Sequence, residues 1–296
     1  MNFESIMPLK SLSGFAKKAI ALFATLIISA CGGGGGTAPV AAPKPVSPAD
    51  TVAPVISLNG EATVTLQQGT TYTDPIDGKS FQKFLPYGYG KQRENVLSPS
   101  TLSLERHRLL WLYLKNETNF FTTPKRVLHF APEQAFYKRF KKIKHFDYVT
   151  TDLNSPIATV KADICNLPFE SNSFDVILCN HVLEHVLDDT KAMQELYRVM
   201  KPSGMGVFQI PQDLKRDTTF EDHSITDKKE RAKIFGQYDH VRIYGKDYFE
   251  KLRTIGFKVD EVDYTATLSN QDIDRYRLAK GEIIPVVYKA TELENY

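Results

Sequence analysis

The part of this sequence that follows residue 122 predicts an α/β fold, with a mostly parallel sheet covered by helices on both faces. Strand and helix segments alternate there, the strand segments are continuously apolar, and the helix segments repeat apolar residues at intervals of three and four. A sheet of this kind binds its ligands in the crevice at the carboxyl ends of its strands. We therefore expect the chemistry of the protein at those ends.

Seven strands and their helices can be placed in order along the chain. The expected strands are 126–131, 146–152, 159–164, 173–180, 205–211, 257–264 and 282–290. The expected helices are 133–142, 188–200 and 246–256, with the break "KPSG" between the second helix and the next strand. A further helix over 101–117 has apolar residues at helical spacing, so we expect it to pack against the domain that follows.

Composition and charge exclude several classes of function. Hydrophobic residues make up 42% of the 296 residues, which allows a well-filled core. The net charge of +2 predicts no nucleic-acid partner. The cysteines Cys31, Cys165 and Cys179 are too few and too scattered for a disulfide framework or a cysteine metal site.

The amino-terminal segment has the pattern of an export signal. Lys10, Lys17 and Lys18 precede the apolar run "AIALFATLIISA", which is shorter than the roughly 20 residues that span a bilayer. The run ends in "IISAC", which resembles a bacterial lipoprotein signal over 1–31 with Cys31 as the lipidated residue. This predicts a membrane-anchored lipoprotein, and an ordinary cleaved signal peptide is the alternative.

Two short pieces follow the signal. Residues 32–50 are rich in glycine and proline and predict a disordered linker. Residues 51–73 alternate apolar and polar side chains around an Asn59–Gly60 turn, which predicts a β-hairpin. The hairpin resembles the opening strands of bacterial immunoglobulin-like modules. Such a sandwich needs about seven strands, so we expect a truncated fragment.

Residues 74–122 form an amino-terminal extension of the main domain. Asp74-x-x-Asp77 and Ser98-x-x-Thr101 stand where a zinc ribbon would keep its two Cys-x-x-Cys turns. A structural zinc site needs thiolate or imidazole ligands, so we predict no zinc here. The extension is either a metal-free relic of a ribbon or a pair of coincidental turns.

Polar residues end four successive strands of the predicted sheet. The first strand runs into His129, Ala131 and Glu133, and the second ends at Asp152, 21 residues after Ala131. An acidic residue at that distance is placed to accept hydrogen bonds from ribose hydroxyls. Asp163 and Ile164 end the third strand. Asn180 and His181 end the fourth.

The stretch from Val160 to Gly204 resembles the core of a class I S-adenosylmethionine-dependent methyltransferase, and the resemblance extends over 123–290. It implies a Rossmann-like fold, S-adenosyl-L-methionine as cofactor and a small-molecule acceptor. It also implies that Asp152 binds the ribose, that Asp163 and Ile164 bind the adenine, and that Asn180 and His181 line the methionine side.

The opening loop departs from that family. The family has an acidic residue and three glycines at alternate positions, where this chain has His129, Ala131, Glu133 and Ala135. Glycines there allow a tight turn and a close approach of the backbone. We expect a cofactor site without glycines, in which Glu133 pairs with the cofactor ammonium.

The long segment after the fifth strand is expected to cover the acceptor. Its candidate catalytic residues are Asp213, His223, His240 and Arg242. We expect His240 and Arg242 to contact an acceptor. The sulfonium is a strong electrophile, so alignment of the reactants matters most, and a base is needed only for a protonated acceptor.

Three other functions compete with methyl transfer. The stretch His181-Val-Leu-Glu184-His185 matches a zinc peptidase signature, which requires both histidines on one helix face. Because the helix is expected to begin near Asp188, we predict no metal. A nicotinamide dehydrogenase would need the missing glycine loop. An idle membrane-anchored surface module, or a chimera joined near residue 75, is the non-enzyme alternative.

Overall fold

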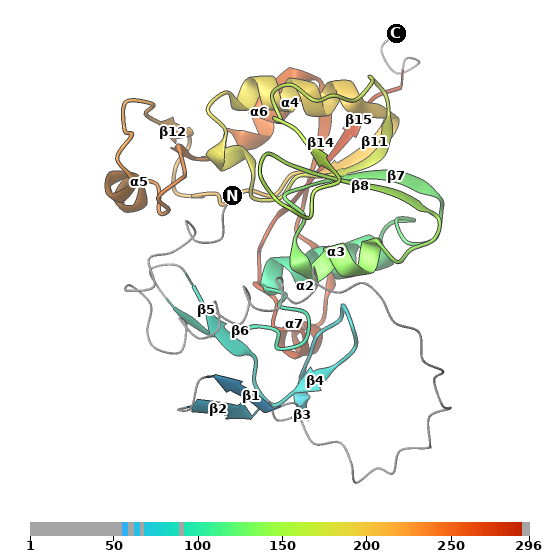
Figure 1. The fold of residues 1–296 in the computed structure, drawn as a ribbon, viewed down its shortest axis with the longest axis vertical. Coiled ribbons are helices and arrows are strands. Elements are labelled where there is room, and N and C mark those ends of the chain that lie inside the picture. Colours follow the sequence, from blue (N-terminus) through green and yellow to red (C-terminus); the bar gives the residue numbers. More distant parts are fainter. Residues whose placement is uncertain (1–54, 59–61, 66–67, 89–91, 292–296) are drawn as a thin grey trace, which may run out of the picture.

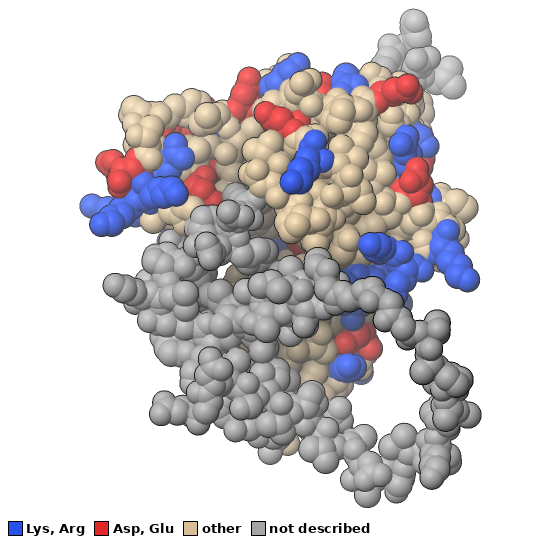
Figure 2. Space-filling view, viewed as in Figure 1, with Lys and Arg blue, Asp and Glu red and all other residues tan. Residues whose placement is uncertain are grey.

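The computed structural model describes residues 55–58, 62–65, 68–88 and 92–291. The predicted signal peptide over 1–31, with Cys31, and the predicted linker over 32–50 lie outside these residues. Within the described ranges, no helix combines the length and the apolar character that crossing a bilayer requires. In Figure 2, Lys and Arg side chains alternate with Asp and Glu over the visible face of the main domain, in keeping with the small net charge.

A seven-stranded sheet forms the centre of the main domain, in the order β14-β15-β11-β10-β7-β8-β9. Its strands are β7 (Lys125–Phe130), β8 (Phe146–Asp152), β9 (Val160–Lys161), β10 (Phe174–Leu178), β11 (Met200–Val207), β14 (Phe257–Val262) and β15 (Ile284–Lys289). All neighbours from β9 to β11 pair in parallel, and β15 is antiparallel to both of its neighbours. The predicted mostly parallel sheet is confirmed.

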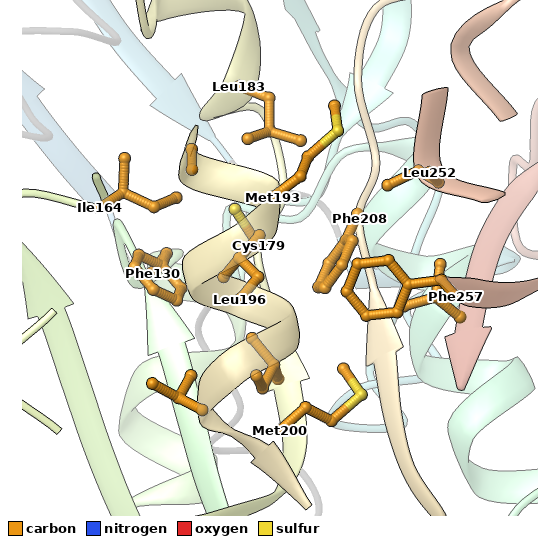
Figure 3. Close-up of a cluster of buried hydrophobic side chains, with 14 of the residues drawn as sticks. Phe130, Ile164, Cys179, Leu183, Met193, Leu196, Met200, Phe208, Leu252 and Phe257 are labelled. Carbon is orange, nitrogen blue, oxygen red and sulfur yellow. The ribbon is translucent and has the colours of Figure 1, made fainter. Parts of the chain in front are cut away.

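Helices cover both faces of the sheet (Figure 1). On one face lie α4 (Asp189–Val199) and α6 (Tyr248–Ile255), and on the other lie α2 (Glu105–Asn116) and α3 (Gln134–Phe140). Each pair of helices shares a hydrophobic cluster with the sheet. Figure 3 shows the α4 side, where Met193 and Leu196 lie over the strands and the rings of Phe208 and Phe257 meet with centroids 5.6 Å apart.

The starts and ends of these helices follow local signals. The Asp188 carboxylate accepts a hydrogen bond from the backbone N–H of Lys191 at 2.8 Å, which caps α4 where the sequence predicted its start. Gly256 ends α6 with φ +113°, a conformation that favours glycine. α5 (Lys228–Ile234), α7 (Asn270–Arg275) and the 3₁₀ turns η3 (Leu183–His185) and η4 (Tyr264–Thr267) complete the helical elements of the described residues.

The strand β11 begins earlier than predicted. The break "KPSG" was expected to separate α4 from a strand over 205–211, but β11 runs from Met200 to Val207. Its pairing with β10 shifts between Phe174↔Met200 and Val176↔Met205. The extra residues form a bulge in which Ser203 has φ +60°. A bulge absorbs turn-forming residues without ending a strand, which explains the difference.

Short hairpins precede the sheet. β1 (Val55–Leu58) pairs antiparallel with β2 (Ala62–Thr65), as the predicted hairpin requires, although Asn59 and Gly60 lie outside the described residues. β3 (Gln68–Thr73) pairs with β4 (Ser80–Phe81), and β5 (Leu85–Tyr87) with β6 (Arg93–Leu97). The β3–β4 pair crosses the predicted boundary at residue 73. Whether 51–73 is a fragment of an immunoglobulin-like module stays a prediction.

The two ribbon-like turns meet in space. The buried Asp74 carboxylate accepts hydrogen bonds from the hydroxyls of Thr101 and Ser103, the second at 3.0 Å, and from the backbone N–H of Ile76 at 2.9 Å. The hydrogen bond between Asp74 and Thr101 thus joins the two turns, although these residues are 27 positions apart in the sequence. The contact connects the two turns, as a zinc ion connects them in a zinc ribbon.

α2 ties the extension to the main domain. The buried guanidinium of Arg108 donates to the carbonyls of Val96 and Ser103 in the extension, at 3.0 and 2.7 Å. It also donates to the carbonyls of Tyr276 and Arg277, at 2.7 and 2.8 Å. Four carbonyls share one buried cation, so the extension and the carboxyl-terminal segment form one packed body.

Candidate cofactor and acceptor site

A cavity of about 500 Å³ opens at the carboxyl ends of β7, β8 and β10. Five of the eight predicted cofactor residues line it. They are Ala131, Asp152, Asp163, Ile164 and His181. The remaining lining is largely apolar and includes Phe130, Val182 and Val186. A cavity with an apolar wall and a few convergent polar groups is the usual form of a small-molecule site.

The two acidic residues of the cavity are held in the same way. One oxygen of Asp152 accepts hydrogen bonds from the backbone N–H groups of Asn154 and Ser155, both at 2.7 Å. One oxygen of Asp163 accepts from the backbone N–H of Cys165 at 2.9 Å. Backbone donors thus fix each carboxylate through a single oxygen. The other oxygen of Asp152 accepts no hydrogen bond from the described residues and is available to a ligand, whereas the Cys165 thiol also lies close to the Asp163 carboxylate.

Two strand ends turn sharply beside the cavity. Ala131 has φ +42° and His181 has φ +54°, so both non-glycine residues adopt the left-handed conformation. Hydrogen bonds hold the turns in place: the N–H of Ala131 donates to the carbonyl of Thr151 at 2.9 Å, and the N–H of His181 to that of Gln209 at 2.7 Å. The tight turn that glycine makes in the resembled family is therefore present here, with the strain of a side chain.

The other three predicted cofactor residues, His129, Glu133 and Asn180, do not line this cavity. His129 and Asn180 are buried, and both contact the carboxylate of Glu133, at 3.0 Å from His129 Nε2 and 3.3 Å from Asn180 Nδ2. His107 of α2 adds a third contact at 3.3 Å through its own Nε2. The carboxylate missing from position 129 is thus supplied from position 133, four residues later.

The hydrogen-bond partner of His107 defines its tautomer, and the partner of His129 allows the same one. Nδ1 of His107 accepts from the backbone N–H of Leu104 at 3.0 Å, so Nε2 carries the proton that faces Glu133. Nδ1 of His129 lies 2.8 Å from the Tyr148 hydroxyl, which can donate to it. Both imidazoles can therefore serve Glu133 as neutral donors.

Burial and charge set the pKa values of this cluster. Burial, together with the neighbouring Arg106, lowers the pKa of His107 to about 4. Burial alone would raise the pKa of Glu133, but the nearby imidazoles of His107 and His129 outweigh it and hold that pKa well below its ordinary value. At pH 7 the cluster therefore contains a charged buried carboxylate beside a neutral His107.

Arg106 is a further residue of the site, which the sequence analysis did not single out. It lines two smaller hollows, one of about 300 Å³ shared with Ala131, Glu133 and Asp152, and one of about 290 Å³ shared with His181. Its buried Nε has no hydrogen-bond partner among the described residues. The signal was the stretch "ERHR" in the predicted packing helix, where polar residues interrupt the apolar spacing.

The predicted acceptor residues lie in different surroundings. Arg242 is 1% exposed, and its guanidinium donates to the carbonyls of Leu183, Val186 and Leu187, with the first and third at 2.9 Å. Arg242 therefore holds the η3 loop and lines neither the main cavity nor the two smaller hollows beside it. Asp213 forms an ion pair with Arg216 at 3.2 Å near the surface.

The two candidate histidines also lie in different surroundings. His223 is exposed, with an ordinary surface contact to Glu221 at 4.0 Å. His240 packs against His185, with ring centroids 4.7 Å apart.

The peptidase signature has no helix to support it. His181 precedes the single 3₁₀ turn η3, and α4 begins at Asp189, after the motif. The two histidines therefore do not project from one face of a helix, as that peptidase chemistry requires.

Residues 118–208 match the methyltransferase domain family. The match begins in the loop after α2 and ends just beyond β11, so it contains all eight predicted cofactor residues. It agrees with the methyltransferase domain that the sequence resemblance implied for this part of the chain.

Curated relatives align with parts of the chain. A 2-phytyl-1,4-naphtoquinone methyltransferase of Nostoc punctiforme is 32% identical over 117 residues, which are 35% of this chain and 50% of the relative. A demethylmenaquinone methyltransferase of Staphylococcus epidermidis is 45% identical over 51 residues, 17% of this chain and 21% of the relative. A sterol 24-C-methyltransferase of Debaryomyces hansenii is 29% identical over 134 residues, 44% of this chain and 34% of the relative. The chain spans half or less of the length of these relatives.

Solved structures are similar at low identity. An S-adenosylmethionine-dependent methyltransferase from Mesorhizobium loti aligns with a TM-score of 0.42 and 16% identity, over 60% of this chain and 96% of the other. A methyltransferase from Archaeoglobus fulgidus aligns with a TM-score of 0.39 and 17% identity, over 61% of this chain and 93% of the other.

Proposed function

We propose that this protein transfers a methyl group from S-adenosyl-L-methionine to a small-molecule acceptor. The observation that carries the proposal is the pair of carboxylates, Asp152 and Asp163, each fixed by backbone donors through one oxygen beside a cavity of about 500 Å³. Asp152 would accept hydrogen bonds from the ribose hydroxyls. Asp163 would accept from the adenine amine, and the backbone N–H of Ile164 would meet a ring nitrogen.

The methionine end of the cofactor fits the hollow of about 300 Å³ beside Ala131. This hollow shares Ala131 and Asp152 with the main cavity, so one ligand can extend from one into the other. Arg106 offers a guanidinium for the cofactor carboxylate. Glu133, whose carboxylate is charged at pH 7, supplies negative charge on the side of the ammonium.

The acceptor fits the hollow of about 290 Å³ on the other side of His181. Its lining includes Arg93, Gln209, Gln212 and Glu282, so it offers polar groups that can orient an acceptor. His181 lines both this hollow and the main cavity. The methyl group would pass beside His181, from the sulfonium to an acceptor atom aligned behind it.

The relatives support a small-molecule acceptor, because their names specify quinone and sterol methyltransferases. Quinones and sterols share an apolar body, and the acceptor hollow includes the apolar side chains of Ile210, Leu214 and Ile283. The predicted acceptor residues keep separate roles in this proposal: His240 lies beside the site, whereas Arg242 holds the loop that forms its wall.

Calorimetric titration of the full chain with S-adenosyl-L-methionine tests the proposal. We expect one binding site per chain, and incubation with methyl-labelled cofactor and a cell extract should transfer label to a small molecule. The alternative, an idle membrane-anchored module or a chimera, predicts no binding at millimolar cofactor. Attachment through Cys31 is a separate proposal, which rests on the resemblance of "IISAC" to a lipoprotein signal. Labelling with a fatty-acid probe tests it, with Cys31→Ser as the control.

A further inference from the structure

Beside the cofactor cavity, two histidines and a glutamate bring their ligand atoms together. The imidazoles of His185 and His240 and the carboxylate of Glu184 each offer one nitrogen or oxygen, and these atoms all lie within 4.8 Å of one another. They come from two separate segments, the turn η3 and the loop before β13 (Arg242–Ile243). Two imidazoles and one carboxylate are a frequent ligand set for divalent transition metals.

The carboxylate of Glu184 lacks the partners that its burial demands. It is 1% exposed, and neither of its oxygens forms a hydrogen bond with any described residue. Its nearest basic groups are Nδ1 of His181 at 3.4 Å and Nε2 of His185 at 3.8 Å. A buried carboxylate without hydrogen bonds is costly, which indicates a ligand that this site is built to hold.

Each imidazole is oriented by a partner on its far side. Nδ1 of His240 lies 3.2 Å from the carbonyl oxygen of Phe235, to which it can donate, so Nε2 presents a lone pair. Nδ1 of His185 lies 3.4 Å from the carboxylate of Asp239, which leaves Nε2 facing Glu184. Metal-binding histidines are typically oriented in this way, by a carbonyl or a carboxylate at the second nitrogen.

The backbone around these ligands is held firmly. The N–H of Val241 donates to the carbonyl of Glu184 at 3.0 Å, which joins the two segments. Arg242, the next residue, donates to the carbonyls of Leu183, Val186 and Leu187 on both sides of Glu184 and His185. The ligand residues are therefore positioned before any ion binds.

The geometry points to a divalent transition-metal site formed by Glu184, His185 and His240, with zinc as the ion best suited to two imidazoles and one carboxylate. Ligand atoms around zinc lie about 2.0–2.2 Å from the ion, so the three side chains would close slightly around it. His185 and His181 line the cofactor cavity, which puts the open coordination positions of the ion near the cavity. The site does not depend on the proposed methyl transfer. It differs from the expectation, drawn from the peptidase signature, that no metal binds here.

Zinc calorimetry on the chelator-treated full chain tests this inference. We expect one zinc ion per chain in the wild type. Binding should weaken by about 100-fold or more in Glu184→Gln, which removes the carboxylate charge, and in His240→Ala, which removes an imidazole ligand. His223→Ala is the matched control, because His223 is an exposed histidine outside the cluster, with its side chain 51% exposed. This variant should bind zinc as the wild type does.

Three results would overturn the inference: a wild type that takes up no zinc at millimolar concentration, a His240→Ala variant that binds as tightly as the wild type, or a His223→Ala variant that loses the site. Circular dichroism of each variant checks its fold. If a variant unfolds, the d–d absorption of Co²⁺ bound to the wild type replaces it as the readout, and a spectrum without imidazole-ligated bands counts against the site. Titration of the same samples with S-adenosyl-L-methionine separates the two proposals: cofactor binding without zinc binding refutes only the metal site, and zinc binding without cofactor binding refutes only the proposed function.

Discussion

Replacing Ala131 by glycine should stabilise the protein, although the change removes a methyl group. Ala131 holds φ +42° at the end of β7, where the resembled family has its first glycine. A side chain in the left-handed region costs roughly 1–2 kcal/mol. Glycine removes this strain in the folded state and keeps the hydrogen bond from the N–H of residue 131 to Thr151.

The gain is partly offset in the unfolded chain. Glycine has more conformational freedom than alanine there, which favours unfolding by about 0.4–1 kcal/mol. The difference between the two effects leaves Ala131→Gly more stable by about 0.5–1 kcal/mol. In a domain of this size, a change of 1 kcal/mol raises the melting temperature by about 2–4 °C.

Ala135→Gly is the matched control, because Ala135 also stands at a family glycine position but lies in α3 and is 1% exposed. Glycine in a helix costs about 0.5–1 kcal/mol, and loss of a buried methyl adds about 0.8 kcal/mol. Urea unfolding should therefore move the midpoint up for Ala131→Gly and down for Ala135→Gly, at an unchanged slope. If Ala131→Gly lowers stability by as much as the control does, the turn is not strained and our account of the loop is wrong.

Three further predictions concern the buried groups around the site. Glu133→Gln should lower the free energy of unfolding by about 2–3 kcal/mol in urea titrations. Both carboxylate oxygens face an imidazole N–H, and the amide would turn its own NH₂ group toward one of these donors. An unchanged midpoint would contradict this. The pKa of His107 is about 4 in the folded protein and near 6.5 in the unfolded chain. Its contribution to the free energy of unfolding, about 3 kcal/mol in total, is therefore present above pH 6.5 and is lost as the pH falls through 4. His107→Gln keeps an acceptor and a donor and should flatten that part of the pH–stability curve. Arg242→Lys should cost about 2–4 kcal/mol of stability, because an ammonium cannot serve the carbonyls that the guanidinium now serves; a variant of full stability with reduced activity would favour the acceptor role that the sequence suggested.

The sequence predicted the fold well where local pattern decides it. The strand over 146–152 has the bounds of β8, and the cap at Asp188 marked the start of α4. These elements depend on periodicity and capping, which a single sequence displays directly. The start of β11 was misplaced because a bulge accommodates the turn-forming residues between Met200 and Met205, and bulges depend on the neighbouring strand.

The candidate site was predicted only in part, because side-chain packing between distant elements decides the rest. Asp152 and Asp163 follow from strand ends alone. The position of Glu133 does not, since its carboxylate turns toward a histidine of α2 that precedes it by 26 residues. Arg242 has the residue type of an acceptor contact, but the unpaired carbonyls of the η3 loop draw it into the interior.

The affinity for S-adenosyl-L-methionine of the double variant Asp152→Asn and Asp163→Asn tests the central claim most directly. Asparagine can keep the side-chain oxygen that accepts from the backbone N–H groups, so the local turns persist while both negative charges are removed. Each charge-assisted hydrogen bond contributes about 1.5–3 kcal/mol, so we expect the calorimetric Kd to rise by about 100-fold or more relative to the wild type. A double variant that binds the cofactor as tightly as the wild type would show that these carboxylates do not hold it.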